Sequence, residues 1–257
     1  MQFEFVVADW AAYADGLTTK SDWLAWALSE PRLPASAVAQ MPALSEVAPM
    51  MRRRIDRLGR LACQVAYWCQ SAEPDVPLVF ASRYGDATRS LALLGDLVHS
   101  QPLSPTGFAL SVHNAVAALY SIARGDLGNA VVVAGGRATA AAALIEARAL
   151  LADGAPEVLV VCYDAPLPDG YAHFAPEVGV EFAWAWRVVP PDAGRQGQRV
   201  RLTLEEGSVV ADPNLASWPE GLSVLRWFLR HTEVCHEPGA CVQAMHSGVS
   251  SVWSSHA

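Results

Sequence analysis

The sequence lacks long apolar runs and any excess of basic charge. No stretch of its 257 residues reaches the roughly 20 consecutive apolar residues of a membrane helix, so we expect no membrane span. Its first residues, MQFEFVVADW, lack the basic segment that opens a signal peptide, and we expect a cytoplasmic location. The net charge of −8 argues against a nucleic-acid partner.

Cysteine pairing patterns are also absent. The five cysteines are scattered and none forms a Cys-x-x-Cys motif, which is typical of reduced thiols in the cytoplasm. A group of two cysteines and two histidines near the end could suggest a metal site (Cys235, His236, Cys241 and His246). Its spacing fits no strong zinc pattern, so we expect no metal and no other cofactor.

Apolar residues, by contrast, make up 52% of the chain, which predicts an extensive core. We interpret residues 1–257 as one domain, with a core over 1–205 and a C-terminal helix and tail over 206–257. Apolar runs predict strands near 3–8, 77–81, 130–134, 158–163, 181–188 and 199–204, the last two forming a hairpin. Helical spacing predicts helices after a Ser21 cap and over 50–70, 87–99, 111–124, 138–153 and 220–231. The fold class is α/β: a mixed sheet of five or six strands with helices on both faces.

The segment from Ser104 to Asp164 organises the chain. Its run AVVVA predicts a buried strand, Gly135-Gly136 a tight turn, and the Ala-rich stretch after it a closely packed helix. A sharp strand-to-helix turn projects its first side chain away from the sheet, and a cysteine there would be activated by the helix N-terminus. This chain has Arg137 at that point. From local sequence alone, Arg137 could equally be a solvated or ion-paired loop residue.

Residues 129–162 resemble the active-site segment of β-ketoacyl synthases in the thiolase-like superfamily. Aligning the synthase helix on residues 138–154 without gaps places Arg137 at the nucleophile position. The resemblance is strongest to half-length, synthase-like chain-length factors of aryl polyene pathways. It rests on a recurring Pro-Thr-x-Phe-x-x-Ser-Val-His-Asn pattern, matched by residues 105–114, and spans 1 to about 189. The fold that it implies is a single thiolase-like half.

The resemblance implies a protein that does not catalyse condensation. Such an enzyme needs a thiolate for the acyl chain and imidazoles for the enolate. Arg137 replaces the nucleophile, and no histidine lies in the glycine-rich contexts of the synthase family. The implied partner is a complete β-ketoacyl synthase, in a heterodimer or heterotetramer, whose acyl tunnel this chain would shape. Acyl carrier protein is the second implied partner.

By the same resemblance, two segments would form the partner interface and the end of the tunnel. One precedes the elbow helix, and the other is the strand that pairs across the two-fold axis in synthases; the residues are Phe108, Leu110, Ser111, His113, Asn114, Ala130, Val131, Val132 and Val133. The alternative for His113 and Asn114 is capping or hydrogen bonding near a helix start.

An arginine cluster opens the predicted helix at 50–70. It contains Arg52, Arg53, Arg54, Arg57 and Arg60, and it is either a solvated basic face or a docking patch for an acidic acyl carrier protein.

Two other functions remain open from the sequence. One is a stand-alone thiol enzyme acting on acyl thioesters through Cys162 or Cys63, although a buried structural thiol is the ordinary interpretation of Cys162. The other is a homodimeric scaffold that binds carrier protein through the arginine cluster.

Overall fold

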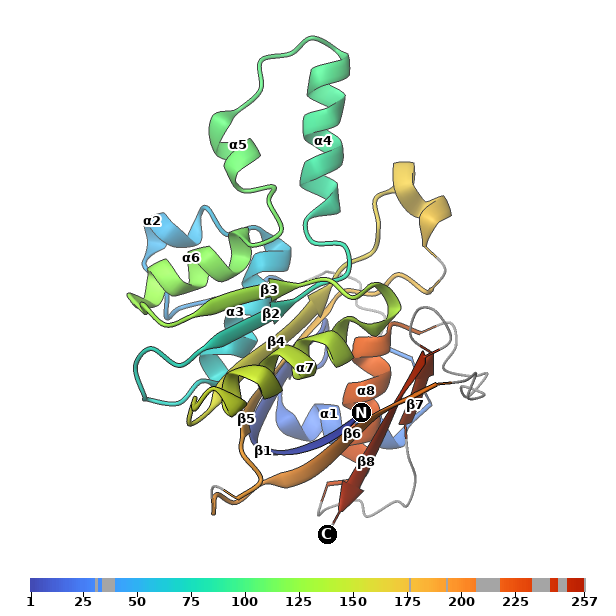
Figure 1. The fold of residues 1–257 in the computed structure, drawn as a ribbon. Coiled ribbons are helices and arrows are strands. Elements are labelled where there is room, and N and C mark those ends of the chain that lie inside the picture. Colours follow the sequence, from blue (N-terminus) through green and yellow to red (C-terminus); the bar gives the residue numbers. More distant parts are fainter. Residues whose placement is uncertain are drawn as a thin grey trace.

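The structure is a computed structural model that describes residues 1–30, 32–33, 40–175, 177–192, 194–206, 218–232, 241–244 and 249–256. These residues form one eight-stranded mixed sheet with helices on both faces (Figure 1). The strands are β1 (Gln2–Tyr13), β2 (Leu78–Ala81), β3 (Ala130–Val133), β4 (Val158–Asp164), β5 (Phe182–Val189), β6 (Gln198–Glu206), β7 (Cys241–Ala244) and β8 (Val249–His256). The predicted fold class is confirmed, but the predicted count of five or six strands is too low.

The strand order is β3-β2-β4-β5-β1-β6-β8-β7. β2 runs parallel to both β3 and β4, and the other neighbouring pairs are antiparallel. The predicted β5–β6 hairpin is wrong, because β1 lies between these strands and pairs with both. β8 pairs with β6, so the tail contributes strands that its sequence does not reveal. Within the described residues, β3 is an edge strand that pairs only with β2.

Helices cover both faces of the sheet and also extend beyond one end of it. They are α1 (Lys20–Leu28), α2 (Pro49–Arg52), α3 (Arg57–Cys69), α4 (Ala87–Val98), α5 (Pro105–Ala109), α6 (Ala115–Arg124), η1 (Gly136–Ala138), α7 (Thr139–Ala152), η2 (Asp169–Phe174) and α8 (Glu220–Arg230). α3 and α6 cover one face, while α7, α8 and α1 cover the other. Among the described residues, no helix combines the length and the apolar character needed to cross a membrane.

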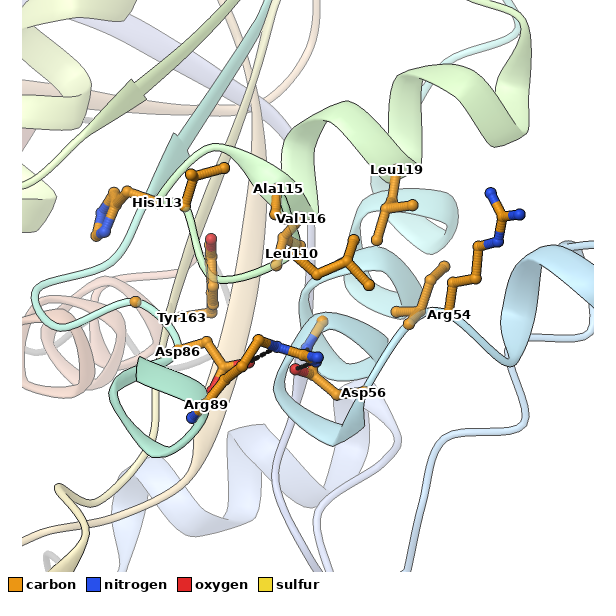
Figure 2. Close-up of a pocket in the computed structure, with 14 residues that line it drawn as sticks. Arg54, Asp56, Asp86, Arg89, Leu110, His113, Ala115, Val116, Leu119 and Tyr163 are labelled. Carbon is orange, nitrogen blue, oxygen red and sulfur yellow. Dashed lines mark hydrogen bonds and ion pairs between the residues drawn. The ribbon is translucent and has the colours of Figure 1, made fainter. Parts of the chain in front are cut away.

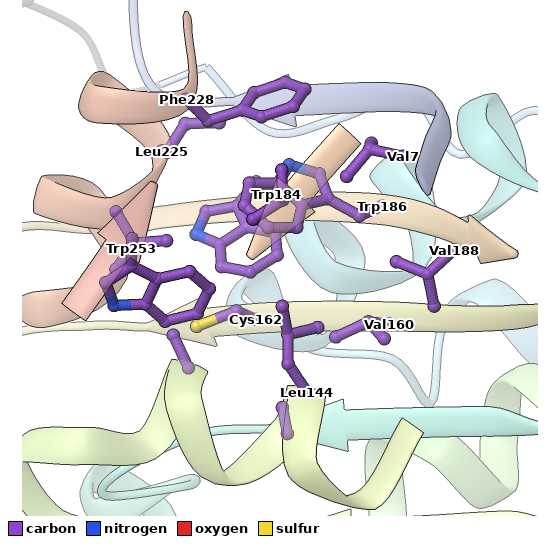
Figure 3. Close-up of a cluster of buried hydrophobic side chains, with 14 of the residues drawn as sticks. Val7, Leu144, Val160, Cys162, Trp184, Trp186, Val188, Leu225, Phe228 and Trp253 are labelled. Atoms are coloured by element: carbon purple, nitrogen blue, oxygen red, sulfur yellow. The ribbon is translucent and has the colours of Figure 1, made fainter. Parts of the chain in front are cut away.

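The core follows the two-residue period of the strands. In β2, Leu78 and Phe80 face α3 and α6, whereas Val79 and Ala81 face α7. The α7 face also carries a group of large aromatic side chains (Figure 3). Trp184 and Trp186 share this face, as their spacing predicts, with ring centroids 4.7 Å apart. This aromatic packing joins β5 to α8.

Local capping shifts several predicted helix boundaries. α1 is capped by Thr19 rather than Ser21, because Thr19 and Asp22 form a reciprocal capping box. The predicted helix 50–70 is two helices, α2 and α3. The Asp56 side chain starts α3 by accepting a hydrogen bond from Gly59 N at 2.8 Å. Ser104 likewise caps a short helix, α5, and the helix predicted from residue 111 begins only at Ala115.

α4 and α5 project from one end of the sheet as an arm, which we define as residues 87–110 (Figure 1). α4 has no buried residue along its length. The arm carries several exposed apolar side chains: Leu94, Leu97, Val98, Leu103 and Phe108. An apolar element that packs so little within its own chain has the character of an interaction surface.

Candidate functional site

The elbow forms where β3 turns into α7 through Gly135, Gly136 and η1. Gly136 has φ +60°, a conformation that favours glycine. A Cβ at Gly135 would lie 2.8 Å from Ala138 O and 2.9 Å from the Ala142 Cβ, so the turn needs a residue without a side chain at this position. Most small residues of α7 are buried, as predicted for a closely packed helix: Thr139, Ala140, Ala141, Ala143 and Ala147.

Arg137 lies in this turn with 47% of its side chain exposed. Its Nε is 3.2 Å from Oε1 of Glu177, which also lies 2.9 Å from Arg83 Nη1. The ion-paired interpretation of Arg137 is therefore confirmed, and its acid belongs to the same chain. Arg137, Arg83 and Glu177 line a small pocket at the elbow with Asp164 and Glu220. We call it the elbow pocket.

The two other acids of the elbow pocket are held by backbone amides. Asp164, at the end of β4, accepts hydrogen bonds from Arg83 N at 3.0 Å and from Ser82 Oγ at 2.8 Å. Glu220 accepts from Ala140 N at 2.7 Å and Ala141 N at 3.2 Å. Burial raises the pKa of Asp164 to about 6 and that of Glu220 to about 8. The described lining of the pocket contains carboxyl and guanidinium groups and no imidazole.

The cysteines that could act as nucleophiles are shielded. Cys63, Cys69 and Cys162 are all buried free thiols. Burial raises the pKa of each, to about 12 for Cys69. A reactive cysteine needs a lowered pKa and access, and these three have neither.

The residues predicted for the partner interface fall into two groups. The β3 residues lie on the free edge of the sheet, with Ala130 exposed and Val131, Val132 and Val133 half-buried. Apolar side chains just before β3 extend this edge, since Ile122 is 63% exposed and Leu127 is 91% exposed.

The second group lies at or beside the arm. Phe108 is 63% exposed on α5, and Ser111 Oγ donates to Phe108 O at 2.8 Å. Leu110 and His113 line a pocket between the arm and α3 with Tyr163 and Arg89, which we call the arm-base pocket (Figure 2). The two interface groups thus occupy separate places on the molecule.

The alternative roles of His113 and Asn114 are not fulfilled. Asn114 holds the capping position of α6, but its side chain makes no capping hydrogen bond. Nε2 of His113 is buried and has no hydrogen-bond partner within the described residues.

The arginine cluster is largely engaged within the chain. Arg52 Nη1 donates to Ala43 O at 2.9 Å, and Arg57 pairs with Glu181 at 2.6 Å and with Asp15 at 3.0 Å. Arg60 donates to two main-chain oxygens, those of Ile55 and Arg52. Arg53 and Arg54 are the exposed members. The candidate docking patch is therefore reduced to these two.

The candidate metal ligands at positions 235, 236 and 246, and the side chain of Cys241, lie outside the described residues. Elsewhere in the described ranges, no group of three or more potential ligands could hold a metal ion.

Sequence reasoning missed Glu177, Glu220, Arg83 and Asp164 as members of the elbow pocket. Pro219-Glu220 at the start of a helical pattern is a recognisable helix start, but nothing local indicates that it meets α7.

Comparison with known proteins agrees with this geometry. The family model described as β-ketoacyl synthase, N-terminal domain, matches residues 23–242. No curated protein matches the chain. A chain in the solved complex of the ketosynthase ApeO with its chain length factor ApeC, from Xenorhabdus doucetiae, is 25% identical. It aligns with a TM-score of 0.80 over 98% of this chain and 99% of that one.

Two more distant structures share the fold. A chain of the ishigamide ketosynthase/chain length factor aligns with a TM-score of 0.71 at 15% identity, over 98% of both chains. A chain of the AntDE:AntF complex, a type II polyketide synthase acyl carrier protein with its ketosynthase, aligns at 0.67 and 10% identity over the whole of both chains. The family match is consistent with the edge strand and the elbow that follows it. The chain belongs to the β-ketoacyl synthase family, through its N-terminal domain.

Proposed function

We propose that this chain is a non-catalytic, chain-length-factor-like partner of a complete β-ketoacyl synthase in polyketide or aryl polyene biosynthesis. The observation that carries the proposal is Arg137, an ion-paired guanidinium at the elbow where the resemblance places a nucleophilic cysteine. The similarity to a chain in the complex of ApeO with ApeC supports it, because that complex pairs a ketosynthase with its chain length factor.

The chemistry of the elbow pocket supports the absence of condensation. A guanidinium stays protonated at neutral pH and cannot carry an acyl group as a thioester. The described lining of the pocket offers no imidazole to stabilise the enolate that forms when a malonyl unit loses carbon dioxide. Cys162 also lines the pocket, but its Sγ would lie only 2.9 Å from a Cβ at Gly221, so it is packed against α8.

The surface of the molecule supports a protein partner. An unpaired apolar edge strand is a liability that natural proteins cover, and β3 with Ile122 and Leu127 is such an edge. The arm adds a second apolar surface through Phe108 and the α4 side chains. A synthase that covers both would remove these exposures. We propose that β3 pairs with the synthase and that the arm reaches toward its acyl tunnel.

The arm-base pocket supports a role in setting chain length. It is bounded by Leu110, Val116 and Leu119 on one side and by Arg89 and His113 on the other. A tunnel that ends against this wall would be limited by the volume of the side chains in it. Replacement of Leu110 by a smaller residue would then lengthen the product.

Co-expression with a complete synthase tests the proposal. We expect a stable complex that makes product, and no turnover by this chain alone. The variants F108D and L127D should prevent complex formation without unfolding the chain, because both side chains are exposed. L28D is a matched control, since Leu28 is 57% exposed at the end of α1, away from β3 and the arm. Condensation by this chain alone would contradict the proposal, and so would a stable monomer that binds none of the synthases tested.

A further inference from the structure

The carboxyl group of Glu220 fills the N-terminal end of α7. Its two oxygens accept the hydrogen bonds from Ala140 N and Ala141 N. These N–H groups belong to the first turn of a 14-residue helix, where amides lack intrahelical acceptors and attract negative charge. The Glu220 residue is only 7% exposed. The strongest anion-attracting feature of the elbow is therefore already occupied from within the chain.

Close packing of α8 fixes Glu220 in this position. A Cβ at Gly221 would lie 2.9 Å from Cys162 Sγ and 3.1 Å from the Phe182 ring, so α8 approaches β4 and β5 as closely as glycine permits. Nε1 of Trp184 donates to Gly221 O at 2.9 Å and holds the same turn. Figure 3 shows Cys162 and Trp184 within the aromatic core that α8 completes. Glu220 is thus held at α7 by the rigid core rather than by a loop.

We propose that Glu220 closes the elbow pocket to acyl thioesters by occupying the amide donors of α7. This inference rests on the proposed function and adds a second barrier to catalysis that is independent of Arg137. A bound thioester would need those donors for its carbonyl oxygen, and a thiolate at position 137 would need them for its charge. Restoring cysteine at position 137 therefore does not by itself restore a nucleophile.

The other acids of the elbow pocket also disfavour a thiolate at position 137. Asp164 on β4 and Glu177 on the loop after η2 place two further carboxyl groups in the lining. Arg83 and Arg137, the basic groups there, both contact Glu177. Negative charge on any of these acids would raise the pKa of a thiol placed among them.

The test measures the pKa of an introduced thiol in the full-length chain. R137C is compared with R137C/E220Q and R137C/E220A through the pH dependence of iodoacetamide alkylation at residue 137. Peptide mass spectrometry separates this cysteine from the native ones. We expect R137C alone to have a thiol pKa at or above the ordinary value of about 8.5. In R137C/E220A the pKa should fall by at least one unit, giving about tenfold faster alkylation at pH 7, with R137C/E220Q between the two.

The matched control is R137C/E157Q. Glu157 is another buried carboxylate, bonded to Ser71 and Arg195, but it precedes β4, at the end opposite Asp164. Its replacement should leave the thiol pKa of R137C unchanged. Near-ultraviolet circular dichroism of the tryptophan cluster verifies the fold of each variant. If R137C/E220A does not fold, the thiol pKa of R137C is compared with that of R137C/E220Q instead, because glutamine has the same shape as glutamate.

Two results would overturn the inference: a lowered thiol pKa in R137C alone, or equal alkylation rates in R137C and both Glu220 variants. The experiment needs no synthase. Its failure is therefore distinguishable from failure of the proposed function, which appears as the absence of a complex.

Discussion

Arg89 and Asp56 join the arm to the body of the protein: Arg89 Nη2 lies 2.7 Å from Asp56 Oδ2. Arg89 belongs to α4, and Asp56 caps the first turn of α3. The same guanidinium lies 2.7 Å from Asp86, which caps α4 (Figure 2). One side chain therefore links the caps of two helices, and the direction of the arm depends on it.

Replacing Arg89 should loosen the arm more than it destabilises the fold. The ion pairs are partly exposed, so R89M should lower the free energy of unfolding by no more than about 1 kcal/mol. Amide hydrogen exchange in α4 should rise clearly, and affinity for the synthase should fall about fivefold. R201M is the control, because Arg201 forms a similar pair with Glu4 on the distant strands β1 and β6. Unchanged exchange in α4 would contradict the anchoring role.

Two glycines give opposite stability predictions. Gly85 has φ +57°, and a Cβ there would lie 2.6 Å from His113 Nδ1. G85A should therefore lower the free energy of unfolding by about 1 kcal/mol or more. Gly95 lies inside α4 with open space around it, so G95A should raise the stability of the arm by about 0.5–1 kcal/mol. Urea denaturation measures both, and equal effects would refute this account of Gly85.

The buried carboxyls predict a stability that falls as pH rises. Burial raises the pKa of Asp164 to about 6 and that of Glu220 to about 8, so the folded chain binds these protons more tightly than the unfolded chain. Their contribution is full below the unfolded pKa of about 4 and is lost as pH rises through the folded values.

Between pH 6 and 8 the free energy of unfolding should decline by roughly 1–3 kcal/mol, mainly through Glu220. Urea denaturation at half-unit steps of pH checks this decline. E220Q should flatten the profile in this interval relative to the parent chain, and parallel profiles would contradict the assignment to Glu220.

The exposed arginines give a test of carrier-protein docking. The double variant R53E/R54E should weaken binding of acyl carrier protein about tenfold at low salt and leave the fold unchanged, because both side chains are exposed. R32E reverses one charge at an exposed site near α1 and should have little effect. Calorimetric titration of the synthase complex measures both, and equal affinities would remove Arg53 and Arg54 from the docking surface.

The central unit was predictable because its signals are local. The valine run of β3, the glycine pair and the alanines of α7 follow one another directly, and each dictates its own conformation. The position of β1 carries no such signal, since its partners β5 and β6 lie about 170–200 residues later and tight turns cannot set that register. β8 escaped detection because its sequence, VSSVWSSH, is rich in serine and reads as polar, although Ser250 and Ser251 are buried.

The chemistry of the elbow was only half predictable. Alignment to the family identifies position 137, but the partner of Arg137 comes from a loop 40 residues away, and Glu220 comes from a helix 80 residues beyond α7's first turn. Contacts between residues so far apart in the sequence depend on how the helices pack on the sheet. Composition and periodicity do not reveal that packing.

The central position of β1 also affects how the chain folds during synthesis. β1 is synthesised well before its two neighbours, β5 and β6, which lie about 170–200 residues later along the chain. At a translation rate of about 5–20 residues per second, β1 remains unpaired for on the order of ten seconds, with its apolar side chains exposed. Exposed apolar side chains on an unpaired strand favour aggregation, so slow translation before residue 182 should increase the aggregation of the nascent chain.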